Sequence, residues 1–272
     1  MFTADFPANP LYKEGYTLEF HDEFERSDLD LTKWIPYYLP HWSSREKSMP
    51  RYRLDEQGLA LHIDADQMPW CPEFDGQVKC SSLQTGLFAG PLDSPIGQHR
   101  FNSRCVVREV QTTQRTYTPL YGYFEARVKA VRSSKHLVAL WMIGFEEVPT
   151  ESGEIAIFEV FSDQITAEGS EIRYGVHPWQ DPHLTDEFYR DVLPIDATKF
   201  HVYAAEWTPS HIDFYVDNTK RRTILQSPNY PMQFMMGIYE LPGETFSQET
   251  YPQRYVIDYF RAYRPIEGYP SR

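Results

Sequence analysis

The chain has 272 residues, of which 41% are hydrophobic and 15% are aromatic. That apolar content excludes an intrinsically disordered chain, and the length is sufficient to bury a substantial core. Its 39 acidic residues outnumber 26 basic ones, which gives a net charge of −13. This charge disfavours binding to the phosphate backbone of a nucleic acid, but it does not penalise a neutral partner.

No apolar run approaches the roughly 20 residues that span a bilayer, and residues 1–15 lack the pattern of a secretory leader. We therefore expect no membrane span and no leader in this chain, and its compartment stays open. The three cysteines, Cys71, Cys80 and Cys105, are odd in number, so at least one lacks a partner within the chain. Cys71 and Cys80 are either bridged or separately buried. No Cys/His spacing of a metal site occurs, and we predict no metal.

Apolar and polar residues alternate in short segments along the chain. The alternation occurs at residues 59–63, 123–130, 212–216 and 255–259, and it is typical of strands with one buried face. Turn signals separate these segments, at 89–91, 208–210, 217–218 and 241–243. Since neither an amphipathic helix nor a βαβ rhythm is present, the pattern predicts an all-β antiparallel sandwich.

Nothing in the composition divides the chain, because it contains no Gly/Ser linker and no internal repeat. We therefore expect a single domain over residues 1–272. Two segments, 34–53 and 68–102, show little alternation and are predicted to be long surface loops. Loops of this length in a compact domain usually form functional walls or lids.

Two acidic residues lie inside an apolar segment at 151–161. In an unbroken strand, Glu154 faces one side and Glu159 faces the core with Ile155, where an unpaired carboxylate is costly. A β-bulge around residues 157–158 returns Glu159 to the face of Glu154. The Cα atoms of the two residues are then about 13 Å apart. If their side chains lean toward each other, the carboxyl groups can approach the separation of roughly 5 Å that a retaining glycosidase needs. The alternative is a strand whose acids are ion-paired or exposed.

At this segment the sequence resembles glycoside hydrolase family 16, whose active strand reads E-x-D-x-E or, with a bulge, E-x-D-x-x-E. The resemblance extends over nearly the whole chain, through residues 18–24 with Trp34, and through 58–61, 121–127, 139–142, 200–207, 214–217 and 257–261. It implies a concanavalin-A-like jelly roll of two curved antiparallel sheets with a concave substrate cleft.

The resemblance also implies roles for the two acids. Glu154 would be the nucleophile, and Glu159 would be the acid that protonates the leaving oxygen and then the base that activates water. The family's middle Asp is replaced here by Ala156, which can neither hydrogen-bond a carboxylate nor shift its pKa. Either the glutamates bias each other, or another residue supplies this effect, or turnover is weak.

Five further residues are candidates for contacting substrate. Trp141 matches a cleft tryptophan of the family, and His177 and Trp179 match its next cleft strand. Arg51 and Trp70, in the long loops, are candidates for outer subsites. For each of these five residues the alternative is a purely structural role.

Together these features predict a retaining endo-hydrolase of a β-linked polysaccharide, with a β-1,3- or β-1,3-1,4-glucan as the expected substrate. The alternatives are a galactan hydrolase and a carbohydrate-binding protein on the same sandwich that is non-catalytic or has attenuated turnover. We expect a monomer that needs no cofactor. Although family members often carry a structural calcium, no ligand spacing here predicts one.

Overall fold

The protein is a sandwich of two antiparallel β-sheets, described by a computed structural model over residues 4–243 and 250–270. One sheet has eight strands: in spatial order β14 (Thr219–Ile224), β13 (Ile212–Val216), β12 (His201–Trp207), β7 (Gly122–Lys129), β16 (Gln253–Pro265), β3 (Gly58–Ile63) and β2 (Arg51–Asp55), with β1 (Tyr16–Asp22) also paired to β16. The predicted all-β antiparallel sandwich is confirmed.

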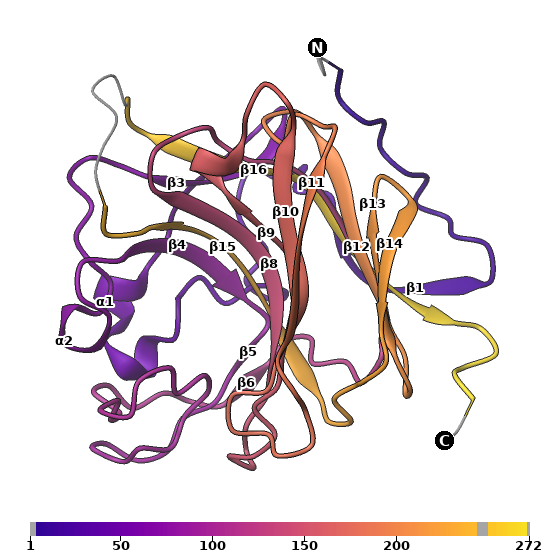
Figure 1. Cartoon of the computed structure of the whole chain (residues 1–272). Helices are drawn as coiled ribbons and strands as arrows, with labels where there is room; N and C mark the ends of the chain where they lie inside the picture. The colour runs from indigo at the N-terminus through magenta and orange to yellow at the C-terminus, as the bar shows by residue number, and fades with distance from the viewer. Residues whose placement is uncertain (1–3, 244–249, 271–272) are drawn as a thin grey trace.

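The second sheet has six strands: β11 (Glu187–Leu193), β10 (Ser170–His177), β9 (Glu154–Phe161), β8 (His136–Gly144), β15 (Met232–Glu240) and β4 (Lys79–Gln84). A small third sheet pairs β5 (Gly86–Leu87) with β6 (Gln114–Arg115). The helical turns are short: η1 (Pro40–Trp42), α1 (Arg45–Ser48), α2 (Pro72–Asp75) and η2 (Ser162–Gln164). Helices α1 and α2 lie at the side of the sandwich opposite β13 and β14 (Figure 1). Within the described residues, no helix is long and apolar enough to cross a membrane.

The main core lies between the two large sheets. Phe124 of β7 packs edge-on against Phe234 of β15, with 4.9 Å between ring centroids, and Phe158 of β9 stacks on Tyr203 of β12 at 4.3 Å. These rings come from the alternating inward positions of their strands. Burial of this inner face leaves the other face of β9 free to carry polar groups.

Part of the predicted loop at 68–102 is a buried strand, which corrects that expectation. Strand β4 was missed because its sequence is largely polar, yet it is almost fully buried. Ser81 donates a hydrogen bond to the carbonyl of His62 at 2.8 Å, and Ser82 donates to the carbonyl of Met236 at 3.0 Å. Hydrogen bonding of this kind makes buried hydroxyls tolerable. The segment 34–53 likewise contains η1, α1 and the start of β2.

A second apolar cluster lies on the other face of the six-stranded sheet, under the segments at 38–42 and 70–107. It contains the three cysteines, which are all buried and free, so Cys71 and Cys80 are not bridged to each other. The same cluster includes Ala139, Trp141 and Ala156. These segments therefore wall off part of the sheet beside β9.

Candidate active site

The two glutamates of β9 lie on one face of the six-stranded sheet because the strand contains a bulge. Opposite β8, Ala156 pairs with Trp141 and Phe158 pairs with Leu140, so Ile157 is the additional residue. Glu154 and Glu159 consequently share the face of Ala156, while the bulge residue faces the main core. The predicted bulge is confirmed.

Both glutamates line one cavity of about 270 Å³. Its wall is rich in rings and in aliphatic side chains: Tyr38, Val78, His99, Leu137, Ala139, Trp141, His177, Trp179, Tyr239 and Leu241, together with the carboxyl group of Asp75. A cavity with mostly apolar walls and a few convergent polar groups is the usual form of a small-molecule or sugar site.

Glu154 is 6% exposed and is held by an indole group. Trp179 Nε1 donates a hydrogen bond to Glu154 Oε2 at 2.7 Å. Burial raises the pKa of Glu154 to about 7, and the neighbouring Glu159 and Asp186 add to that increase. His177 and the Trp179 hydrogen bond act in the opposite direction, because they favour the carboxylate.

Burial also raises the pKa of Glu159, against the opposing effects of His177 and Arg173. Two neighbouring carboxyls that both resist ionisation retain a proton to higher pH than isolated ones. Because Ala156 lies between them, there is no third carboxylate at this point of the strand. Burial is the main cause of both increases in pKa, and the charge of Glu159 adds to the increase at Glu154.

His177, Trp141 and Trp179 lie in the cavity wall. His177 Nδ1 is 2.5 Å from Asp186 Oδ1, and its ring stacks on Phe188 with 4.4 Å between centroids. Trp141 is 6% exposed, and its Nε1 donates to the hydroxyl of Tyr239 at 3.1 Å. Trp179 is 45% exposed, so it presents the more accessible ring face.

Arg51 and Trp70 are not among the residues that line this cavity. Arg51 lies on β2 of the other sheet, where its Nη1 contacts Asp64 at 2.8 Å and Asp66 at 2.5 Å. Trp70 is 1% exposed and packs edge-on against Tyr38. Its Nε1 donates to Asp75 Oδ2 at 2.7 Å. Trp70 thus contacts Tyr38 and Asp75, which both line the cavity.

Sequence reasoning missed several wall residues, of which His99 is the most informative. Its ring lies 5.0 Å from that of Trp141 and 4.7 Å from that of Trp179. Its backbone N–H donates to Glu146 Oε1 at 2.6 Å. No motif marks His99 or Glu146, because their contact joins two loops that are distant in sequence.

His99, Glu146 and Trp179 share an unusual backbone conformation, with φ values of 50°, 60° and 47°. Non-glycine residues rarely adopt this left-handed region, and such strained positions concentrate at functional sites. Here the three residues form a series of contacts that ends at Glu154. The loops that build this side of the cavity are therefore held in a specific conformation around Glu154.

Comparisons with known proteins agree with this geometry. The model of the glycosyl hydrolases family 16 matches residues 100–261, more than half of the chain. The GlcNAcα1-4Gal-releasing endo-β-galactosidase from Clostridium perfringens is 34% identical, over 98% of this chain and 67% of that one, with a TM-score of 0.87. A laminarinase from Flavobacterium sp. UMI-01 shares the fold at 19% identity, over 91% of this chain and 100% of that one, with a TM-score of 0.64.

Among curated relatives, a β-glucanase from Rhodothermus marinus is 28% identical over 172 residues, which is 54% of this chain and 58% of the relative. The match thus spans less than two thirds of that β-glucanase. The jelly-roll sandwich and the paired glutamates across a bulge define the class as a glycoside hydrolase fold. The chain belongs to glycosyl hydrolases family 16.

Proposed function

We propose that this protein is a retaining endo-hydrolase of a β-linked glycan, with Glu154 as nucleophile and Glu159 as acid/base. The observation that carries the proposal is that both carboxyls line one cavity while Trp179 donates a hydrogen bond to Glu154. The roles of the two acids follow their order in the family motif. The N–H donor of Trp179 stabilises the carboxylate form of Glu154, although it does not outweigh the burial that raises the pKa of this group to about 7.

In the first step, Glu154 Oε attacks the anomeric carbon, and the bond from that carbon to the leaving oxygen breaks while Glu159 donates its proton to that oxygen. In the second step, a water attacks the same carbon, Glu159 takes the proton of the water, and Glu154 departs as a carboxylate. Two side chains fill every role, so the proposed chemistry needs no cofactor.

For the substrate, we propose a β-galactoside linkage. The support is the likeness to the endo-β-galactosidase, which extends over 98% of the chain, whereas the β-glucanase match extends over 54%. A galactose ring presents a broad apolar face because its 4-hydroxyl is axial, and the exposed indole of Trp179 suits stacking against such a face. A β-1,3- or β-1,3-1,4-glucan, the expectation from the sequence alone, is the second candidate, and the β-glucanase relatives favour it.

The test is product analysis of the whole chain on β-1,4-galactan, β-1,3-glucan, mixed-linkage β-glucan and glycans ending in GlcNAcα1-4Gal. We expect oligosaccharide products from a galactose-containing substrate and loss of at least about 10³-fold in kcat for Glu154→Gln. Azide should rescue Glu154→Ala on an activated aryl glycoside with inverted stereochemistry, and Glu159→Ala with retained stereochemistry. Binding without any product from the wild-type chain would instead favour the non-catalytic alternative.

A further inference from the structure

A second cavity, of about 450 Å³, opens on the outer face of the eight-stranded sheet. Tyr123 and Glu125 of β7 line it, and both side chains alternate with the inward Phe124. The N-terminal segment from Asn9 to Tyr16 forms one rim. Since the glutamates of β9 lie on the far face of the other sheet, this cavity is separate from the candidate active site.

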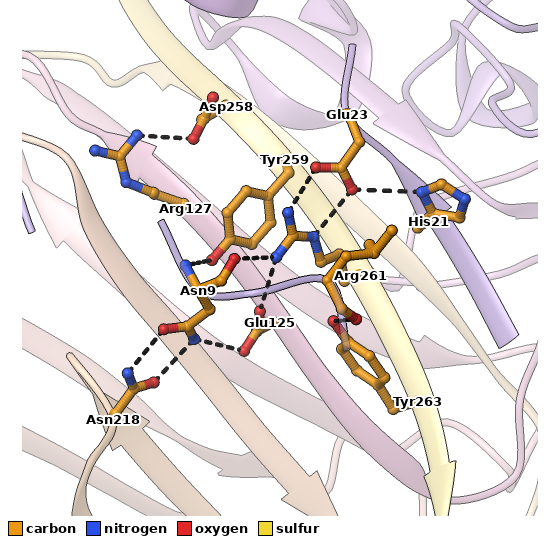
Figure 2. Close-up of polar contacts among 11 residues, drawn as sticks. Asn9, His21, Glu23, Glu125, Arg127, Asn218, Asp258, Tyr259, Arg261 and Tyr263 are labelled. Atoms are coloured by element: carbon orange, nitrogen blue, oxygen red, sulfur yellow. Dashed lines mark hydrogen bonds and ion pairs between the residues drawn. The ribbon is translucent and has the colours of Figure 1, made fainter. Parts of the chain in front are cut away.

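The rim segment is tied to the sheet by polar contacts that Figure 2 displays. Asn9 Nδ2 donates to Glu125 Oε2 and to Asn218 Oδ1, each at 2.9 Å, and Arg261 Nη1 donates to the carbonyl of Asn9 at 2.8 Å. The rim is thus a built part of the cavity.

Tyrosine rings supply the apolar surface of this cavity. Tyr123 lies 5.9 Å from Tyr16 and 5.8 Å from Tyr215, measured between ring centroids. Tyr12, which is 77% exposed, lies at the entrance. Lys13 covers a face of Tyr123, so Tyr12 offers the accessible ring that can pack against the C–H face of a pyranose.

The cavity also holds a hydrogen-bonding group with unused capacity. Lys13 Nζ lies 3.6 Å above the Tyr123 ring, half-buried, and among residues 4–243 and 250–270 no acceptor lies within hydrogen-bond distance of it. Glu125 is 2% exposed and already has partners: its Oε2 accepts from Asn9 at 2.9 Å, and its Oε1 is ion-paired with Arg261 at 3.7 Å. A bound hydroxyl that accepts a hydrogen bond from Lys13 is therefore favoured here.

We infer that this tyrosine-lined cavity is a second saccharide-binding site for a neutral pyranoside. The carboxyl groups of Glu14, Glu125 and Glu206 disfavour an anion. A cation is disfavoured because the ammonium of Lys13 already occupies the face of Tyr123. A ligand with hydroxyls and an apolar ring face can accept a hydrogen bond from Lys13 and pack against the exposed ring of Tyr12.

This inference goes beyond the proposed hydrolase activity. A site on the opposite side of the sandwich would hold a long glycan at a second point. Linked sites of this kind raise the local concentration of the chain at a polymer without any new contact in the cleft.

The test is affinity electrophoresis in gels that contain soluble β-1,4-galactan or β-1,3-glucan. The Glu154→Gln background keeps the polymer intact, and retardation is read without any need for turnover. We expect Tyr12→Ala and Lys13→Met to weaken retardation at least threefold, while Tyr52→Ala, a matched exposed tyrosine on β2, does not. Lys13→Met keeps the aliphatic stem, and thermal unfolding checks that the variants remain folded.

In the catalytically intact chain, Tyr12→Ala and Lys13→Met should leave kcat/KM unchanged on a small aryl glycoside, because such a substrate cannot reach both sites. Unchanged retardation of both variants in both gels would overturn the inference. Stabilisation of the wild-type chain by choline or spermidine, abolished in Lys13→Met, would also overturn it, because the cavity would then be a cation site. Neither result depends on whether the chain hydrolyses glycans.

Discussion

Trp179 Nε1 donates a 2.7 Å hydrogen bond to Glu154 Oε2, and it does so from a residue in the left-handed region, with φ of 47°. The ring edge of Trp179 meets His99 at 4.7 Å, and His99 in turn donates through its backbone to the buried Glu146. The carboxyl that we propose as nucleophile is therefore oriented by a loop that packs on a second loop. Strain in these loops is compensated by the contacts around them.

Removal of the indole N–H should raise the pKa of Glu154, because that donor favours the carboxylate. In Trp179→Phe, which keeps a ring beside His99, we expect the acidic limb of the kcat profile to move up by about one pH unit. At the midpoint of the wild-type limb, kcat should fall about fivefold, and well below that midpoint about tenfold. Trp207→Phe is the control. Trp207 Nε1 donates a 2.9 Å hydrogen bond to Ser227 Oγ, and Trp207 does not line the cavity. An unmoved limb in Trp179→Phe would contradict the role of the hydrogen bond.

The position between the two glutamates is fully buried, so a charge introduced there has strong effects. We expect Ala156→Asp to lower the free energy of unfolding by about 2–3 kcal/mol, because a buried unpaired carboxylate is costly. The new charge should also move both limbs of the pH–rate profile to higher pH, as like charges disfavour each other. Ala156→Asn, with nearly the same volume and no charge, should share the loss of stability but not the shift. A gain in kcat at neutral pH for Ala156→Asp would show that the native site is attenuated.

Burial raises the pKa of Glu146 to about 8 from the ordinary value of 4.5. Between these values the unfolded chain loses the proton that the folded chain keeps, so stability falls as pH rises. Glu146 alone should contribute a slope of up to about 1.4 kcal/mol per pH unit. In Glu146→Gln, whose Oε1 can still accept from His99, denaturant unfolding from pH 5 to 8 should show a correspondingly shallower decline. The exposed Glu147→Gln should leave the slope as it is.

Substitutions of Trp141 and Arg51 should have different effects on substrate binding. Trp141→Phe should raise KM about two- to tenfold, because it reduces the ring in the cavity wall and removes the hydrogen bond to Tyr239. Arg51→Ala should leave kcat/KM within about twofold and should change stability by less than about 1 kcal/mol, since its ion pairs lie at the surface. Steady-state kinetics and thermal unfolding measure these effects. A large KM effect at Arg51 would place it in contact with substrate after all.

Several features of the fold and site were predictable from the sequence because they depend on neighbouring residues. The alternation around Phe124 predicts a strand, and strand β7 is found there. The bulge near Ile157 was predictable because an unbroken strand would bury Glu159 among apolar groups.

Other features were not predictable because their causes lie far away in sequence. Strand β4 has no apolar alternation, and its buried serines are satisfied by the carbonyls of His62 and Met236, which belong to other strands. Trp70 lies in a segment predicted as a surface loop, yet it is 1% exposed and contacts Asp75 and Tyr38. The contact of His99 with Trp179 joins positions 80 residues apart.

The sequence by itself determined the all-β sandwich and the shared face of Glu154 and Glu159, because local alternation and the cost of a buried carboxylate decide both. Only the tertiary structure decided which loop groups surround those glutamates. Burial by distant segments raises their pKa values, and Trp179 reaches Glu154 because two loops pack together. Such contacts depend on how the chain closes in space, and local spacing carries no information about them.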